Sequence, residues 1–367
     1  MDTGFWRSGL AGLSCALFAA TPACHSIVEY GNGAPLEGVD AGPWTNVTAN
    51  LAGLPSECGS VASLSTRPDR DVVIAGVALH GLWANADGGT AWSRLGESTG
   101  SATIINRPTA IVYDPEHPRT WWESGIYNGN AVYRTDDDGA TFQVLGDAVH
   151  CDLVSIDFAD PARQTLLAGG HESRRLLRST NGGLTWTDIA GTLPADVGST
   201  TFPLVIDAQV HLIGSYNGAS AGVHRTEDGG KTWARVSAIA VKSRPQQTAD
   251  GAIYWMAEDN LGVVRSLDQG RTWTRVIGPG VLASTETGLV VLPSGRLVAA
   301  GGRALMISKD RGTTWQSLGQ PLPFAPAGVV YSPARKSFYI WHYLCNVPPV
   351  VVPDDAILAM SFDDGAP

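Results

Sequence analysis

The segment GGHESRR brings together side chains that could carry out acid–base chemistry. His171 could take or give a proton near neutral pH, and Glu172 beside it could act as an acid or a base. Hydrolysis of a glycosidic bond requires a second carboxyl group across the bond, and Glu258 and the adjacent Asp259 are candidates for it. We therefore take Glu172, Glu258 and His171 as candidate catalytic residues. A single histidine on a loop more often has a solvated or structural role, which is the alternative for His171.

Elimination across a uronic acid would need a different set of groups. It needs a histidine or tyrosine that removes a proton and an arginine that binds the carboxylate. His171, Tyr216 and Arg244 could fill these roles. The HExxH, GxSxG, P-loop and Rossmann signatures are absent, and the cysteine spacing does not fit a zinc site. We therefore expect neither a metal nor a cofactor.

Three arginines on polar segments could recognise a carboxylate on a ligand, because a guanidinium group pairs with it through two hydrogen bonds. The simpler interpretation is that they pair with acids of the chain itself, such as Glu258 and Asp259. Aromatic residues on similar segments could contact the same ligand. The candidate ligand-binding residues are Arg107, Arg244, Arg303, Tyr127, Tyr216 and Asp259.

An eight-residue pattern repeats along the chain and defines the elements that must position these side chains. It reads NADGGTAW, TDDDGATF, STNGGLTW, TEDGGKTW, SLDQGRTW and SKDRGTTW. The aromatic residues that end successive copies are 50, 44, 47, 40 and 42 residues apart, a spacing typical of repeat architectures. A turn bounded by strand-like runs lies upstream of each copy. Each repeat therefore predicts four antiparallel strands, which is one blade of a β-propeller.

The repeated pattern resembles the Asp-box, or BNR repeat, Ser/Thr-x-Asp-x-Gly-x-Thr-Trp, of sialidase-like and glycosyl-hydrolase-like β-propellers. Asn85 replaces the leading Ser/Thr, Asn181 replaces the Asp, and Phe142 replaces the Trp. In that family the box is a structural turn, and a short Asp or Asn side chain can indeed bond the N–H groups of its own turn. The residues to which the resemblance gives this structural role are Asp87, Asp137, Asn181, Asp228, Asp268, Asp310 and Asp363.

The two ends of the chain each carry half of a seventh copy. SFDDG at 361–365 lacks the Thr-Trp that should follow, and GPWTNV at 42–47 lacks the turn that should precede Trp44. Joined, the halves complete one blade, in which residues 44–49 would pair antiparallel with residues 356–361. We therefore predict an all-β, seven-bladed β-propeller whose last blade is closed by strands from both termini. Trp44 should be buried much as Trp92 and Trp186 are.

The alternation of strand direction divides the connections of the blades between two faces. In the propellers that the repeat resembles, the Asp-boxes lie on one face and ligand sites usually open on the other. We expect the candidate site residues to surround one depression on that second face. The connections within blades bring to it His80, Tyr127, Asn128, His171, Glu172, Tyr216, Asn217, Glu258, Asp259, Arg303 and His342. The connections between blades bring to it Glu57, Arg107, His150, Asp152 and Arg244.

The first residues of the chain differ from the rest. Arg7 is followed by a short apolar run, so residues 1–23 are interpreted as a secretory signal peptide, with a buried helix as the alternative. Residues 24–42 would form a tether and residues 43–365 a single propeller domain. Cys24 could carry a lipid, so the protein would be secreted, periplasmic or a membrane-anchored lipoprotein. One disulfide among Cys58, Cys151 and Cys345 is possible in that setting, and the pairing stays open.

Composition leaves two classes of function. A formal net charge of −10 and a pI near 5.2 argue against nucleic acid and anionic membranes as partners. The first class is a monomeric propeller that binds an extracytoplasmic glycan or protein on the face opposite the Asp-boxes. The second is a secreted glycan-cleaving enzyme, namely a glycoside hydrolase, a sialidase-like enzyme or a polysaccharide lyase. Binding is favoured because no complete catalytic set can be traced.

Overall fold

The computed structural model describes residues 41–57, 60–86, 90–96, 100–259, 262–276, 287–342 and 350–365. The predicted signal peptide and the positions of Cys24, Cys58, Asp87 and Cys345 lie outside the described residues. Within the part of the chain that is described, no helix has the length and apolar character needed to cross a membrane.

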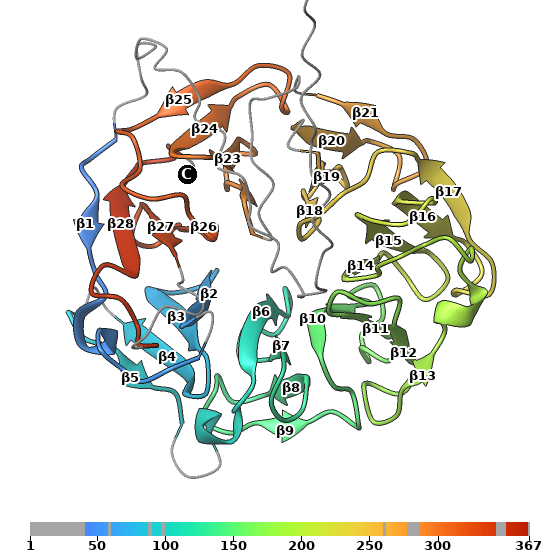
Figure 1. Cartoon of the computed structure of the whole chain (residues 1–367), viewed down its shortest axis with the longest axis horizontal. Helices are drawn as coiled ribbons and strands as arrows, with labels where there is room; N and C mark the ends of the chain where they lie inside the picture. The colour runs from blue at the N-terminus through green and yellow to red at the C-terminus, as the bar shows by residue number, and fades with distance from the viewer. Residues whose placement is uncertain are drawn as a thin grey trace, which may run out of the picture. The chain divides into compact units, whose positions relative to one another are not determined.

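Seven four-stranded antiparallel sheets form the blades of a β-propeller, as the sequence predicts (Figure 1). In the first six blades, the four strands follow one another in the chain. The first three blades contain β2 (Val61–Thr66), β3 (Val72–Val77), β4 (Gly81–Ala86) and β5 (Ser93–Arg94); β6 (Arg107–Tyr113), β7 (Trp121–Ile126), β8 (Val132–Thr135) and β9 (Gln143–Val144); and β10 (Cys151–Ile156), β11 (Leu166–Gly170), β12 (Leu176–Ser179) and β13 (Thr187–Asp188).

The next three blades have the same order. They contain β14 (Phe202–Val205), β15 (His211–Ser215), β16 (Gly222–Thr226) and β17 (Ala234–Ser237); β18 (Gln246–Gln247), β19 (Ile253–Met256), β20 (Val263–Ser266) and β21 (Thr274–Arg275); and β22 (Leu289–Val291), β23 (Leu297–Gly301), β24 (Ala304–Ser308) and β25 (Gln316–Leu318). Three short 3₁₀ helices lie between blades, η1 (Ala49–Leu51), η2 (Ser101–Thr103) and η3 (Ala190–Thr192).

The seventh blade combines both ends of the described chain. Its strands are β26 (Gly328–Ser332), β27 (Ser337–Trp341), β28 (Ile357–Ser361) and, on the outside, β1 (Thr45–Asn46). In β1, Thr45 pairs with Ala359 and Asn46 with Leu358, both antiparallel, and Figure 1 shows β1 beside β28 at the edge of the ring. The predicted closure is therefore confirmed. The outer strand is shorter than predicted because η1 begins at Ala49.

The core lies between neighbouring blades, because alternate residues of a strand point to opposite faces of its sheet. Trp121 and Trp122, adjacent on β7, illustrate this. Trp121 packs with Ile74 and Leu82 of the first blade, whereas Trp122 packs with Val154 of the third. Both indole rings are almost completely buried. Each blade thus covers the faces of its two neighbours, and this fixes the position of the connections that carry polar side chains.

The turn before each fourth strand has the same hydrogen bonds in five blades. In the fifth blade, the Ser266 hydroxyl donates to Asp268 Oδ1 (2.8 Å) and accepts the Gly270 N–H (2.8 Å). Asp268 Oδ1 also accepts the Thr272 N–H (2.9 Å), and Oδ2 accepts the Thr272 hydroxyl (2.6 Å). Burial acts to raise the pKa of Asp268, but these hydrogen bonds outweigh it and bring the pKa to about 2. Gly270 has φ +81°, which favours glycine.

The same bonds recur in the second, third, fourth and sixth blades, where one position is an asparagine. Asn181 Oδ1 accepts the Thr185 N–H (3.0 Å), and its Nδ2 donates to the Thr185 hydroxyl (2.8 Å). An amide therefore preserves the turn by reversing one hydrogen bond. The geometry assigns a structural role to the aspartates of these turns, because their oxygens are occupied by the turn itself.

We expect Asp268→Ala to lower the free energy of unfolding by about 1–3 kcal/mol, because three hydrogen bonds of the turn are lost. Asp268→Asn should cost clearly less, since Asn181 serves the same turn in the third blade. Urea-induced unfolding of the two variants tests this. Equal losses for both substitutions would show that the turn hydrogen bonds are not the source of the stabilisation.

Trp44 takes the place that the aromatic residue of the turn has in other blades. Its ring is half-buried and packs against the hydrophobic core between the sixth and seventh blades. Trp186 is likewise half-buried, whereas Trp92 is 3% exposed. Trp44 thus resembles Trp186 in burial more than Trp92.

Candidate functional site

The connections of each blade divide between two faces of the ring. The links from first to second strand and from third to fourth strand lie on one face, which we call the turn face. The links from second to third strand and from blade to blade lie on the other, the loop face. Tyr127 follows β7 and His171 follows β11, while His150 and Asp152 lie at the start of β10, so all four belong to the loop face. We call these four residues the histidine cluster.

Within the histidine cluster, His171 lies between Asp152 and Tyr127 and contacts both. His171 Nδ1 is 2.8 Å from Asp152 Oδ2, and His171 Nε2 is 3.3 Å from the Tyr127 hydroxyl. A carboxylate accepts only, so the hydrogen-bond partners assign the proton of the neutral ring to Nδ1. The lone pair on Nε2 then faces the Tyr127 hydroxyl. The three residues form a chain Asp152–His171–Tyr127 along which a proton can move.

The second histidine has the opposite arrangement. The backbone N–H of Tyr127 donates to His150 Nδ1 (3.0 Å), so the neutral ring of His150 carries its proton on Nε2. Burial lowers the pKa of His150, and the charges of His171 and Arg175 act in the same direction, while Glu172 opposes them. His150 is therefore a neutral hydrogen-bond donor at pH 7. The rings of His150 and His171 meet edge to face, with centroids 5.1 Å apart.

A bulge in β10 aims Asp152 into the cluster. Cys151 pairs with Gly170 and Leu153 with Gly169, so Asp152 is the extra residue of the bulge. The hydroxyls of Thr109 and Ser124 in the second blade donate to its backbone oxygen, at 2.7 and 3.2 Å. The Asp152 side chain is 1% exposed. Two blades thus hold this carboxylate in a fixed orientation towards His171.

Three residues around the cluster have left-handed backbone conformations that are costly for any residue except glycine. The φ angles of Tyr127, His150 and Glu172 are +67°, +62° and +47°. Each such residue costs about 1–3 kcal/mol, so the surrounding contacts must hold it in place. One of these contacts joins the two loops directly, because the His171 N–H donates to the His150 backbone oxygen (3.0 Å). Leu79, in the corresponding loop of the first blade, has φ +67°, so the left-handed residue of this loop is a feature of the repeat.

Positive charge flanks the cluster, and the adjacent thiol is inert. The guanidinium carbon of Arg107 is 6.0 Å from the centre of the Tyr127 ring, and Arg175 Nη1 donates to the Val149 backbone oxygen (3.2 Å). The ring of Tyr127 is 49% exposed. Burial raises the pKa of the Cys151 thiol to about 12, so it stays protonated and is not a nucleophile. The contacts of Tyr127 with Arg107 and His171 thus bring together three predicted site residues.

The predicted catalytic acids come from different blades. Glu172 is exposed next to His171 in the third blade, and its charge reaches His150. Glu258 follows β19 in the fifth blade, where its N–H donates to the Ala240 backbone oxygen (2.9 Å). Asp259 pairs with Arg275 of the outer strand β21 (3.1 Å). The pairing of Glu172 with Glu258 as a hydrolytic pair therefore stays a prediction.

The other predicted ligand-binding residues also lie on the loop face, away from the histidine cluster along the ring. Tyr216 follows β15 in the fourth blade, and Lys242 Nζ lies 5.1 Å from the centre of its ring. Arg244 is half-buried just before β18, and Arg303 is exposed between β23 and β24. These residues come from the fourth, fifth and sixth blades, so the convergence of the three predicted arginines on one ligand stays a prediction.

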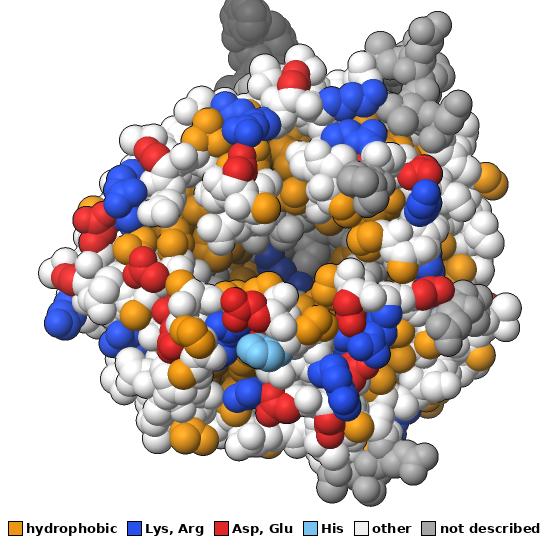
Figure 2. Space-filling model, turned by 180° about the vertical axis from the view of Figure 1, so that it is seen from behind, with side chains coloured by type: hydrophobic (Ala, Val, Ile, Leu, Met, Phe, Trp, Pro, Cys, Tyr) orange, Lys and Arg blue, Asp and Glu red, His pale blue; other side chains and the backbone are white. Residues whose placement is uncertain are grey.

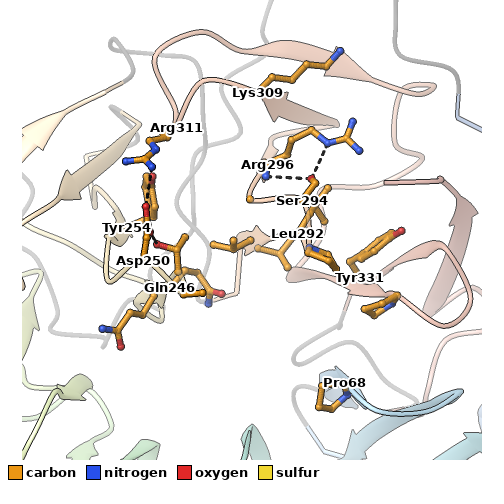
Figure 3. A pocket seen from close by; sticks show the side chains of 18 of the residues that line it. Pro68, Gln246, Asp250, Tyr254, Leu292, Ser294, Arg296, Lys309, Arg311 and Tyr331 are labelled. Atoms are coloured by element: carbon orange, nitrogen blue, oxygen red, sulfur yellow. Dashed lines mark hydrogen bonds and ion pairs between the residues drawn. The ribbon is translucent and has the colours of Figure 1, made fainter. Parts of the chain in front are cut away.

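A pocket of about 780 Å³ lies at the turn face and is lined by none of the predicted site residues. Its walls are the turns between first and second strands of the first, fifth, sixth and seventh blades, together with Lys309 and Arg311. In Figure 3, Arg311 contacts Asp250 (2.8 Å), and Arg296 contacts Ser294 (Nε to Oγ, 3.0 Å). Figure 2 shows a face whose centre is hollowed, with acidic and basic side chains around the hollow. Two of the basic side chains that line the pocket, Arg296 and Arg311, are already bonded to residues of the chain itself.

The order of strands predicts His150 and Asp152 on the loop face but gives them no role, and it gives no signal for Arg175. The tripeptide His-Cys-Asp before a buried strand was the available signal, since it puts two polar groups where β10 begins. The bulge that makes Asp152 face His171 cannot be read from the sequence. Among the described residues, no group of three or more His, Cys, Asp and Glu side chains could hold a metal ion.

Comparison with known proteins identifies the fold. No protein-family model matches the chain, and no curated protein sequence matches it. Similar solved structures include a GH74 enzyme from Niastella koreensis (TM-score 0.60, 17% identity, 82% of this chain and 52% of that one) and the GH74 xyloglucanase from Xanthomonas campestris (0.57, 18%, 86% and 55%). YCF48 bound to a D1 peptide is also similar (0.56, 17%, 89% and 99%). The chain spans about half the length of the two GH74 enzymes. At these identities the likeness is one of fold.

Proposed function

We propose that this propeller binds an acidic glycan at the histidine cluster on its loop face. The observation that carries the proposal is the exposed ring of Tyr127, which has the Arg107 guanidinium within 6.0 Å of its centre and the rings of His150 and His171 at 5.3 and 5.5 Å. An aromatic ring offers an apolar face for the C–H groups of a sugar, while neighbouring donors take its hydroxyl and carboxylate oxygens. The loop face is opposite the repeated turns, which we interpret as Asp-boxes.

The similar structures are compatible with a glycan or a peptide ligand and do not decide between the two. One is a xyloglucanase and another is bound to a peptide, so the same fold serves glycans and peptides. The cluster favours a glycan, because its polar groups are directed donors and acceptors around one exposed ring. The charged N-terminal region followed by an apolar run supports export, with the chain then secreted, periplasmic or held at a membrane through Cys24.

Binding is tested by titrating the full chain with uronic-acid oligosaccharides and with neutral xyloglucan oligosaccharides. We expect the acidic series to bind and Tyr127→Ala to weaken that binding tenfold or more, which corresponds to about 1.4 kcal/mol. Leu184→Ala is the matched control, because Leu184 is 62% exposed on the turn face. Binding that is unchanged in Tyr127→Ala, or binding of the neutral series in place of the acidic series, would refute the proposal.

A further inference from the structure

We infer that the histidine cluster also breaks the chain of a uronic-acid glycan by β-elimination, with Tyr127 as the group that contacts the reacting carbon. The inference rests on the proposed function and extends it from binding to a reaction. Its basis is the line of contacts from Asp152 Oδ2 to His171 Nδ1 (2.8 Å) and from His171 Nε2 to the Tyr127 hydroxyl (3.3 Å).

This line of contacts makes the Tyr127 oxygen a base. When the oxygen takes a proton from a ligand, its own phenolic proton can pass to His171 Nε2, because that nitrogen carries a lone pair. The imidazolium that results lies against the Asp152 carboxylate, which is 1% exposed and stabilises the positive charge. Tyrosine alone is a weak base at neutral pH, since its ordinary pKa is about 10. Because His171 accepts the phenolic proton and Asp152 stabilises the imidazolium that forms, the Tyr127 oxygen can act as a base at neutral pH.

A uronic acid supplies a proton that such a base can remove. The C5–H bond is adjacent to the carboxylate, so the charge that develops at C5 spreads onto the carboxylate oxygens. His150 Nε2–H, which is directed by the Tyr127 N–H on its other nitrogen, can donate a hydrogen bond to these oxygens. The positive charge of Arg175 is close enough to act on His150 and would act on the same oxygens.

The reaction balances without water or a redox partner. The C5–H bond breaks, its electrons form the C4–C5 double bond, and the C4–O bond to the next sugar breaks. The Tyr127 hydroxyl then gives a proton to the departing oxygen and takes back the proton held on His171 Nε2, so the protein ends in its starting protonation state. One side chain thus serves as base and then as acid, which requires the proton and the leaving group to be on the same face of the sugar.

The geometry favours elimination over hydrolysis at this place. Hydrolysis of a glycosidic bond uses two carboxyl groups that flank the bond. Asp152 is buried and bound to His171, so it does not serve as one of them. The strained backbone at Tyr127, His150 and Glu172 supports a site held in one arrangement, because such conformations persist only where contacts impose them.

The test is incubation of the full chain with polygalacturonate, alginate and hyaluronan, and with xyloglucan as a neutral polymer. Elimination leaves a C4–C5 double bond conjugated to the carboxylate, which is seen by ultraviolet absorbance and as unsaturated ends by mass spectrometry. We expect this product from at least one acidic polymer and none from xyloglucan. Tyr127→Phe should lower the rate about 100-fold or more, while the affinity stays within about threefold because the ring remains.

A matched histidine on the opposite face controls for general effects of substitution. His117 Nδ1 lies 3.5 Å from Asp114 on the turn face, so His117→Asn removes a histidine beside an aspartate without touching the cluster. His171→Asn should abolish the unsaturated product, and His117→Asn should leave it unchanged. Acidic polymer that is bound but not cleaved would overturn the inference and leave the proposed function intact. Failure to bind any acidic polymer would overturn both.

Discussion

Replacing Asp364 by alanine is expected to destabilise the entire ring, lowering the free energy of unfolding by about 3 kcal/mol. Asp364 is 4% exposed near the end of the described chain. Its Oδ2 accepts the Ser294 N–H (2.8 Å), and its Oδ1 accepts the Ser294 hydroxyl (2.7 Å) and Arg296 Nε (2.8 Å). These bonds connect the last residues of the seventh blade to a turn of the sixth. Without them, the partly buried Ser294 N–H loses its acceptor and Arg296 loses the carboxylate that neutralises its charge.

The neighbouring Asp363 is the matched control for this prediction. It is exposed and pairs with Lys336 at the surface (2.8 Å), so Asp363→Ala should change the unfolding free energy little. Urea-induced unfolding of both variants provides the comparison, and limited proteolysis shows whether the ends open first. A loss in Asp363→Ala as large as that in Asp364→Ala would contradict the role given to Asp364.

The same comparison shows what the sequence could and could not predict about the closure of the ring. The half-patterns at the two ends predicted that β1 and β28 would share a blade, because each half lacks what the other contains. Spacing assigned the structural role at the C-terminal half to Asp363, two residues after Ser361. In the structure Asp363 Oδ1 accepts the Gly365 N–H (2.9 Å) at the surface, and Asp364 makes buried bonds to the sixth blade in addition. These bonds of Asp364 have no counterpart in the repeated pattern, so no repeat spacing predicts them.

The histidine cluster was predictable in its location but not in its chemistry. Strand alternation placed Tyr127, His150 and His171 on one face, because the order of strands in a blade fixes where each connection lies. The contact of His171 with Asp152 depends on the bulge in β10, and the contact with Tyr127 depends on a left-handed backbone. Both features also occur in the first blade, where a bulge lies between Val61 and Ser63 and Leu79 has φ +67°. The repeat therefore fixes the backbone of these loops, but it does not fix which of their side chains contact one another.

The repeated pattern also gives no indication that the second blade contains a buried acid. Glu123 on β7 is 0% exposed and pairs across the sheet with Ile111 and Tyr133. Its Oε2 accepts a hydrogen bond from Asn106 Nδ2 (3.4 Å). Among the described residues, its Oε1 and Asn106 Oδ1 are buried without a hydrogen-bond partner. A proton on the carboxyl group would supply a donor where two acceptors meet, so burial favours the neutral acid.

Glu123→Gln is therefore expected to stabilise the protein, and more so as the pH rises. Burial raises the pKa of Glu123 well above its ordinary value, and the hydrogen bond from Asn106 only partly opposes this. The folded state then binds the proton more tightly than the unfolded state. The contribution of Glu123 to stability is complete below pH 4.5 and declines as the pH rises towards the folded-state pKa, by at most about 1.4 kcal/mol per pH unit. A glutamine has no such decline.

The measurement is urea-induced unfolding of the wild type and Glu123→Gln at pH 5, 6 and 7. The advantage of the variant should grow with pH over this range, by at most about 1.4 kcal/mol per pH unit, because the other ionisable groups are common to both proteins and cancel in the difference. A difference that stays flat over this range would mean that the folded state keeps Glu123 ionised. The interface between the first and second blades would then have to provide a partner for that charge, which the contacts of β7 do not offer among the described residues.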